Sequence, residues 1–406
     1  MNHSKAEQDA VAAQWVAALA ELFIDAPRPV ALHEPEIGAE EQALVAECLA
    51  SGWVSSVGEF VTRFGDKLAA LCGARHAIPC VNGTAALQMC CLLAGVTPAD
   101  EVLVPTLTFI GTANAVSHSG ALPHFVDAER ARFGIDPLKL DDYLARSSRL
   151  EAGGARNLAS GRLIKALVVV HIFGHPVALD ELAAVARKWN LVLIEDAAES
   201  LGSTYKGSPV GAVARLGALS FNGNKVVTSG AGGAILTNDD ELGARARHLT
   251  TTAKQAQRFE FIHDEIGYNY RLPNLNAALG LAQLAKLDDF IVRKRVVAAA
   301  YIEALADLPG ARVLREPADS VSNYWLNALV LDNEHRGLRD TLLEATNDLK
   351  IMTRPLWRPM HLLPIYAGHP RMPDLSIAEN LYSRVINLPS SPRLAPLLAA
   401  ARSRAP

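Results

Sequence analysis

Short apolar runs alternate with amphipathic stretches along residues 29–284 of the chain. The runs have the length of strands, whereas the stretches between them carry apolar residues at helical spacing. We therefore expect strands at Val102–Pro105, Leu122–Val126, Leu163–His171, Leu191–Asp196, Ala218–Asn222 and Gly233–Thr237. Helices are expected at Thr84–Gly95, Phe109–Ser119 and Leu179–Trp189. Apolar strands that alternate with helices are typical of an α/β fold, in which helices cover both faces of a mostly parallel sheet.

The two ends of the chain have different patterns. Trp15, Leu19, Leu22 and Phe23 recur at helical spacing, which predicts an N-terminal helical extension over residues 1–28. A long helical pattern begins after Asn274 and runs to about residue 306, and short strands and helices follow it. The sequence thus predicts a large domain at 29–284 and a smaller C-terminal α+β domain at 285–406, with the boundary inside the long helical pattern.

Composition excludes several classes of protein. The 406 residues are 50% hydrophobic and 20% charged, a balance that disordered chains lack. The net charge of -4 gives no electrostatic reason to bind nucleic acid, and no apolar run reaches the roughly 20 residues of a membrane span. The N-terminus lacks the features of a signal peptide and the 5 cysteines form no paired spacing, so we expect a cytoplasmic protein. The histidines lack ligand spacing, which predicts no metal site.

Two polar residues follow predicted strands. Asp196 lies at the edge where open parallel sheets bind ligands, and it could pair with a protonated ring nitrogen or cap a following helix. Lys225 follows a tight Asn-Gly-Asn connection. A lysine in a turn is usually solvated, whereas a lysine held over a crevice can form a Schiff base. The nearby glycines at 230–233 let the backbone pass close to another group.

A third segment, 81–87, joins an apolar run to Gly83 and Thr84 at a predicted helix start. Free backbone N–H groups and the helix dipole make such a start an anion site, although Thr84 is equally well explained as a plain helix cap. The spacing matches neither a dinucleotide fingerprint nor a Walker loop. An anion cradle, an aspartate at a strand end and a later lysine are together what pyridoxal phosphate (PLP) requires, so the sequence predicts a PLP site.

Six ordered segments resemble the DegT-type family of PLP-dependent sugar aminotransferases, which has the fold-type-I architecture. They are residues 52–58, 82–87, 105–109, 195–200, 220–225 and 267–274, and the similarity runs from about Val30 to Ser391. Residues 55–58, 220–225 and 351–357 look most like the branch that aminates C4 of UDP- or GDP-linked 4-keto-6-deoxy-N-acetylhexosamines. That branch serves the legionaminic acid and bacillosamine pathways.

The resemblance implies roles for individual residues. Lys225 would form the Schiff base and move the proton, and Asp196 would hold the pyridinium nitrogen. Glu199 would lie by the cofactor 3-hydroxyl, where many relatives carry Gln, which leaves the protonation state of that hydroxyl open. The phosphate would be bound by Gly83, Thr84 and Ser220, and Phe109 would stack on the ring.

The same resemblance implies a homodimer with shared active sites, because Asn269 would reach the phosphate in the neighbouring subunit. Candidate substrate contacts are Trp53, Ser55, His171, Arg271, Trp357 and His361. Arg271 could bind the carboxylate of the amino donor or be an ordinary surface or interface arginine. His171 could touch a ligand or be a satisfied structural histidine.

We therefore expect a PLP-dependent aminotransferase that moves an amino group from an amino acid to a nucleotide-linked keto sugar for bacterial surface glycans. The resemblance implies L-glutamate as the donor. Two alternatives stay open: an aminotransferase for a different keto sugar or small carbonyl compound, and a catalytically silent PLP-binding regulatory protein. A sugar dehydratase on the same fold is disfavoured, because those relatives replace the lysine that Lys225 supplies here.

Overall fold

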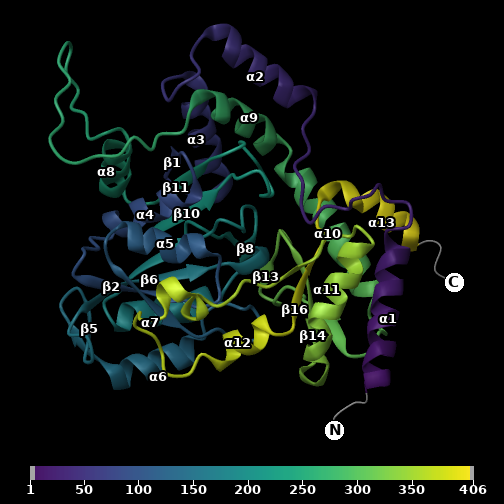
Figure 1. Cartoon of the computed structure of the whole chain (residues 1–406). Coiled ribbons are helices and arrows are strands. Elements are labelled where there is room, and N and C mark those ends of the chain that lie inside the picture. The colour runs from purple at the N-terminus through teal and green to yellow at the C-terminus, as the bar shows by residue number, and fades with distance from the viewer. Residues whose placement is uncertain (1–4, 403–406) are drawn as a thin grey trace.

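A nine-stranded sheet forms the centre of the larger part of the molecule in the computed structural model, which describes residues 5–402 (Figure 1). The outermost residues of the predicted segments, 1–4 and 403–406, lie outside the described residues. Seven strands follow the order β1-β11-β10-β7-β6-β2-β3, and β4 and β5 extend from β6. Their bounds are β1 His76–Cys80, β2 Asp100–Pro105, β3 Leu122–Val126, β4 Ser148–Glu151, β5 Gly154–Asn157, β6 Leu163–Val170, β7 Val192–Asp196, β10 Leu216–Ser220 and β11 Gly233–Thr237.

The predicted mostly parallel sheet is confirmed. Strand β10 pairs in parallel with β7, β7 with β6, β6 with β2, and β2 with β3. Strand β11 is antiparallel to both β1 and β10, because the helix-free connection 221–232 reverses the chain without the crossover that a parallel strand needs. Six strands therefore end at the same edge of the sheet.

Helices cover both faces of this sheet, as the continuous apolar strands predict. Val102 and Val104 of β2 share a core cluster with α4 (Gly83–Leu93), α5 (Ile110–His118) and α8 (Asp240–Thr250). Leu103, between them, packs with α6 (Pro137–Ser147) and α7 (Leu179–Lys188) on the opposite face. Alternate residues of one strand thus belong to different cores, which is why the strand has no polar face.

The C-terminal part is built on a four-stranded antiparallel sheet of order β12-β14-β16-β15. Its strands are β12 Ala311–Val313, β14 Asn327–Leu331, β15 Arg354–Pro355 and β16 Val385–Leu388, and α11 (Arg339–Asp348), α12 (Ser376–Tyr382) and α13 (Ala395–Arg402) accompany them. The predicted N-terminal helix exists as α1 (Lys5–Leu22) and lies beside α11 and α13 (Figure 1). Trp15 of α1 is fully buried in one core cluster with Tyr301 and Leu329, so the two ends of the chain share a core.

The long helical pattern after Asn274 forms two helices, α9 (Asn274–Ala285) and α10 (Leu287–Ala304), so the prediction of one continuous helix is wrong. The break at Lys286 lies beside the predicted boundary at 284/285. Glu41 of α2 (Ala39–Ser51) is buried there and accepts hydrogen bonds from Gln283 and Lys286, both at 2.7 Å. The break lets α9 pack on α2 and α3 (Glu59–Cys72) while α10 packs on the C-terminal sheet.

The remaining strands, β8 (Thr204–Tyr205), β9 (Ser208–Pro209) and β13 (Ser320–Val321), form a small sheet that joins the two parts of the chain. Among residues 5–402, no helix combines the length and the apolar character needed to cross a membrane.

Candidate active site

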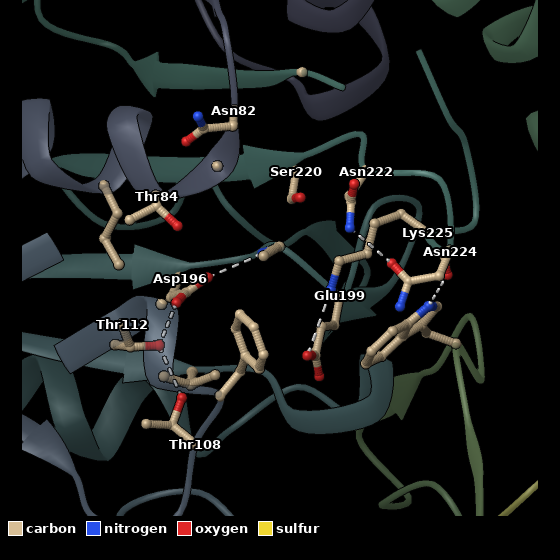
Figure 2. Close-up of a pocket in the computed structure, with 18 of the residues that line it drawn as sticks. Asn82, Thr84, Thr108, Thr112, Asp196, Glu199, Ser220, Asn222, Asn224 and Lys225 are labelled. Atoms are coloured by element: carbon tan, nitrogen blue, oxygen red, sulfur yellow. Dashed lines mark hydrogen bonds and ion pairs between the residues drawn. The ribbon is translucent and has the colours of Figure 1, made fainter. Parts of the chain in front are cut away.

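The carboxyl edge of the large sheet borders a cavity of about 360 Å³ (Figure 2). Residues at or after the ends of five strands supply its walls, and the C-terminal part closes one side with two indole rings. The residues that carry the argument are Asn82, Gly83 and Thr84 after β1, Thr108, Phe109 and Thr112 after β2, Asp196 and Glu199 after β7, Ser220, Asn222, Asn224 and Lys225 after β10, and Trp325 and Trp357.

Helix α4 begins at one end of this cavity. Asn82 is its N-cap residue, and its side-chain oxygen accepts a hydrogen bond from the Ala85 amide at 2.8 Å. The alternative that Thr84 is the plain cap is therefore wrong, because Asn82 holds that position. A Cβ on Gly233 would lie 2.4 Å from the carbonyl of Asn82, so this glycine lets β11 pass directly under the helix start. The first amides of a helix have no partner within it, which makes this end an anion cradle.

Asp196 is buried at the end of β7. Its Oδ2 accepts a hydrogen bond from the Thr112 hydroxyl at 2.8 Å, and its Oδ1 accepts one from the Ala198 amide at 3.2 Å. The residues that follow form turns, so the alternative that Asp196 caps a helix is wrong. Burial raises the pKa of Asp196, and the Thr112 hydrogen bond acts against that rise. A carboxylate kept this far from water is stabilised by a positively charged partner.

Lys225 reaches into the cavity and is not a solvated turn lysine. Its side chain is 13% exposed, and its Nζ lies 3.6 Å from Oε1 of Glu199. The same Nζ lies 3.8 Å from the centroid of the Trp325 ring. Burial raises the pKa of Glu199 to about 7, and the charge of Lys225 opposes this shift. The amine thus stands between a carboxyl group that titrates near neutrality and an aromatic face.

Eight of the predicted site residues line this single cavity: Gly83, Thr84, Phe109, Asp196, Glu199, Ser220, Lys225 and Trp357. The other six predicted residues lie outside it: Trp53, Ser55, His171, Asn269, Arg271 and His361.

Two of these six are buried histidines with structural partners. His171 lies 3.0 Å from a carboxylate oxygen of Glu195 through Nε2, and its Nδ1 accepts from the Val177 amide at 3.2 Å. His361 contacts Thr106 at 2.7 Å and Glu379 at 2.9 Å through its two ring nitrogens. Both rings therefore have protein partners, and neither lines the cavity.

The other four lie at the surface. Trp53 and Ser55 are exposed in the loop between α2 and α3. Asn269 is exposed, and Arg271 is half-buried beside β1. These four side chains therefore do not line the cavity of their own chain.

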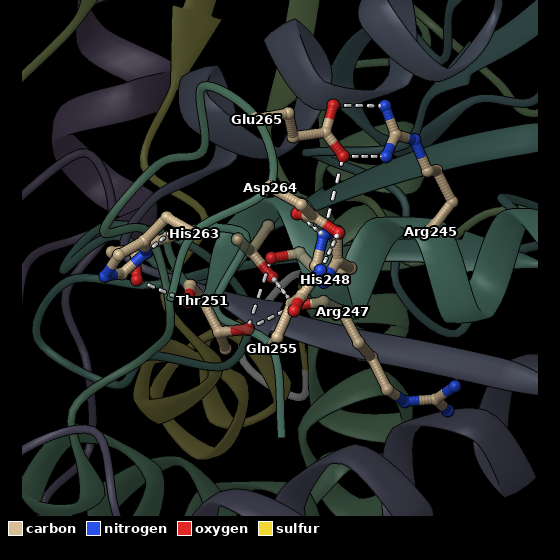
Figure 3. A network of polar contacts seen from close by, with 10 residues as sticks. Arg245, Arg247, His248, Thr251, Gln255, His263, Asp264 and Glu265 are labelled. Carbon is tan, nitrogen blue, oxygen red and sulfur yellow. Dashed lines mark hydrogen bonds and ion pairs between the residues drawn. The ribbon is translucent and has the colours of Figure 1, made fainter. Parts of the chain in front are cut away.

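A polar network fixes the segment that precedes Asn269 (Figure 3). Arg245 of α8 pairs with Glu265, and Nε2 of His248 lies 2.7 Å from Oδ1 of Asp264. Residues 254–266, which include Asp264 and Glu265 of this network, project from the body of the molecule as a long arm (Figure 1). The network therefore ties the arm to α8, and both of its carboxylates have partners within the protein.

Sequence reasoning missed several residues of the cavity. No sequence pattern pointed to Thr112 or Trp325. Thr112 resembles an ordinary helix residue, and Trp325 lies 100 residues beyond Lys225. Thr108, Asn222 and Asn224 lie inside segments that carry the family resemblance, and their position in those segments was the signal that could have identified them.

Comparison with known proteins adds independent evidence. The model of the DegT/DnrJ/EryC1/StrS aminotransferase family matches residues 35–398. The chain is 36% identical to the GDP-perosamine synthase of Caulobacter vibrioides, over 90% of this chain and 94% of that protein. It is 34% identical to EpsN of Bacillus subtilis, which is named as a pyridoxal phosphate-dependent aminotransferase, over 89% of this chain and 91% of that protein.

Solved structures give the same result. A DegT/DnrJ/EryC1/StrS aminotransferase from Brucella abortus superposes with a TM-score of 0.79 at 30% identity, covering 90% of this chain and 95% of the other. Helicobacter pylori PseC, an aminotransferase of pseudaminic acid biosynthesis, superposes with a TM-score of 0.81 at 25% identity, covering 92% and 98%. The fold is therefore that of the fold-type-I aminotransferases, as the resemblance in the sequence implies.

Proposed function

Because the chain belongs to the DegT/DnrJ/EryC1/StrS aminotransferase family, we propose that it aminates the C4 keto group of a nucleotide-linked 4-keto-6-deoxy sugar. The family uses pyridoxal phosphate and acts on nucleotide sugars, so the chain is a PLP-dependent aminotransferase of amino-sugar biosynthesis. One observation carries the proposal for the site: an amine, two carboxyl groups and a helix start converge on one cavity.

The residues present fit the cofactor. The start of α4 suits a phosphate group. Gly83 and Gly233 have no side chains, and this lets the segments at the helix start pack closely together. Asp196 is a buried carboxylate with no charged partner in direct contact among residues 5–402, which suits a protonated ring nitrogen. Lys225 presents the one amine that lines the cavity among the described residues, which suits an aldehyde.

When bound, pyridoxal phosphate supplies an electron sink next to the reacting amine. Asp196 would keep the proton on the ring nitrogen, and the hydroxyl of Thr112 would hold the carboxylate in place. In the first half-reaction Lys225 would take the proton from the amino-bearing carbon of the donor and deliver it to the cofactor, and in the second it would move a proton from the cofactor to C4 of the sugar. Phe109 and Trp357 would exclude water from the reacting atoms.

Two observations address the identity of the sugar. The motifs at 55–58, 220–225 and 351–357 favour an N-acetylated sugar, whereas relatives named GDP-perosamine synthases favour a GDP-linked one. A panel of UDP- and GDP-linked 4-keto sugars with L-glutamate, with amine products identified by mass, decides between them. A purified enzyme that aminates none of them would contradict the proposal.

We also propose that two chains share their active sites. The exposed arm carries three highly exposed apolar side chains, Phe259, Phe261 and Ile266, which monomeric surfaces rarely present together. Asn269 and Arg271 follow this arm along the chain and do not line the cavity of their own subunit. In a homodimer, Asn269 would complete the phosphate site of the partner.

A further inference from the structure

A second cavity, of about 460 Å³, adjoins the first. The two cavities share Asn224, Trp325 and Trp357 as wall residues. The two indole rings are stacked, with centroids 6.5 Å apart and an interplanar angle of 17°. Because Nζ of Lys225 lies 3.8 Å from the centroid of the Trp325 ring, the second cavity begins one indole away from the reacting amine.

The ionisable groups of this second cavity are basic. Arg354 and Arg358 line it, and no Asp or Glu does so among the described residues. Arg354 donates only to uncharged partners, the side-chain oxygen of Asn347 at 3.0 Å and the carbonyl of Thr353 at 2.8 Å. Arg358 has no ion pair with any residue in the part of the chain that the structure describes. Two guanidinium groups thus lie at one cavity without a counter-charge.

A buried polar atom in the same wall also lacks a partner. Asn387 is 3% exposed, and its side-chain oxygen has no hydrogen bond within the described residues. Both ring nitrogens of His33 are also shielded from solvent, but the backbone of Asn224 contacts that ring, so the Asn387 oxygen is the atom in this wall that lacks a partner among residues 5–402. Such atoms are rare in folded proteins, because they lose water without gaining a replacement. The Asn387 oxygen is an acceptor, so a hydroxyl or amino group of a ligand would complete its hydrogen bonding.

A buried lysine lies behind the wall, and burial lowers the pKa of its amine well below the usual value for lysine. Lys294 is fully buried, and its Nζ donates to the carbonyls of Trp325 at 3.1 Å and Ser390 at 2.6 Å, with no carboxylate at hand. Burial lowers the pKa of His33, and the charges of Lys294 and Lys225 lower it further. The surroundings therefore disfavour a protonated His33 at this wall.

We propose that the second cavity binds an oxyanion group, a carboxylate or a phosphate, of a substrate that reacts at Lys225. Guanidinium groups form paired hydrogen bonds with both kinds of oxyanion. The inference rests on the proposed function, which supplies two substrates of this chemistry: the carboxylates of the amino donor and the diphosphate of the nucleotide sugar.

The test uses the holoenzyme and two probes, glutarate for the carboxylate arm and GDP or UDP for the phosphate arm. Isothermal titration calorimetry measures the Kd of each probe for wild type, Arg354→Gln, Arg358→Gln and the double variant. Arg187→Gln is the matched control, because Arg187 is exposed on α7, far from either cavity. Loss of a charge-assisted hydrogen bond should raise Kd by about 10- to 100-fold.

A rise confined to glutarate identifies the donor carboxylate, and a rise confined to GDP or UDP identifies the phosphate; either result supports an oxyanion site. Unchanged Kd values for both probes in the double variant, or no binding of either probe to wild type, would overturn it. Amino transfer from L-glutamate is followed separately by the absorbance of the cofactor. Arginine-dependent binding without amino transfer would leave this site standing and remove the proposed function.

Discussion

Replacing Glu199 with Gln should change how the stability of the cofactor-free protein depends on pH. Burial raises the pKa of Glu199 from 4.5 to about 7. Between pH 4.5 and about pH 7, Glu199 therefore keeps its proton in the folded protein, whereas the same side chain has released it in the unfolded chain. The stabilisation linked to this proton is complete below pH 4.5 and is lost as the pH rises through 7. At about 1.4 kcal/mol per unit, the loss amounts to roughly 3 kcal/mol.

The variant cannot titrate at this position, so it should gain about 3 kcal/mol relative to wild type between pH 5 and pH 8. The burial that raises the pKa of Asp196 acts in both proteins and cancels in the comparison. Denaturant midpoints of the two apoproteins at several pH values measure the difference. Glu59→Gln is the control, because the Glu59 side chain is 79% exposed. A variant whose midpoint follows the wild-type curve at every pH would refute the reasoning.

Four further predictions follow from the site. Lys225→Ala should lose turnover by more than the 10²–10⁴-fold typical of one acid/base group, and borohydride should no longer attach the cofactor to the chain; a label elsewhere contradicts the assignment. Asp196→Asn should keep the cofactor, seen by its absorbance, but lose most activity, and a wild-type rate would leave this carboxylate without a catalytic role. Gly233→Ala forces a Cβ to within 2.4 Å of the Asn82 carbonyl, so cofactor retained per chain should fall; full retention would show that the cradle tolerates the shift. Inactive Lys225→Ala and Asn269→Trp chains should regain part of the activity when mixed and reassembled, because one mixed dimer site lacks both changes; proven exchange without activity, or an active monomer in sedimentation, would count against shared sites.

The chemistry of the cavity was largely predictable from the sequence, because each main part depends on a local pattern. The apolar runs before Asn82 and Asp196 are strands, and parallel strands place their carboxyl ends at one edge. The glycines at 230–233 were expected to let the backbone pass close to another group, and Gly233 does so at Asn82. Such features are encoded within about ten residues, so they can be recognised without the fold.

Other parts of the site could not be predicted locally. His171 and His361 resembled ligand contacts, but Glu195 and Glu379 engage their rings within the protein. Trp325, which faces Lys225, belongs to a different part of the chain.

The sequence by itself determined the order of strands and helices, the helix start and the identity of the amine and the carboxylates. Only the tertiary structure decided that Trp325 and Trp357 close the first cavity and that Arg354 and Arg358 both line the second cavity. It also decided that Lys286 separates two helices. The physical reason is distance along the chain. The spacing of apolar residues and the small size of glycine act between residues that are near in sequence. The packing of the C-terminal part against the large sheet determines which side chains that are distant in sequence come into contact.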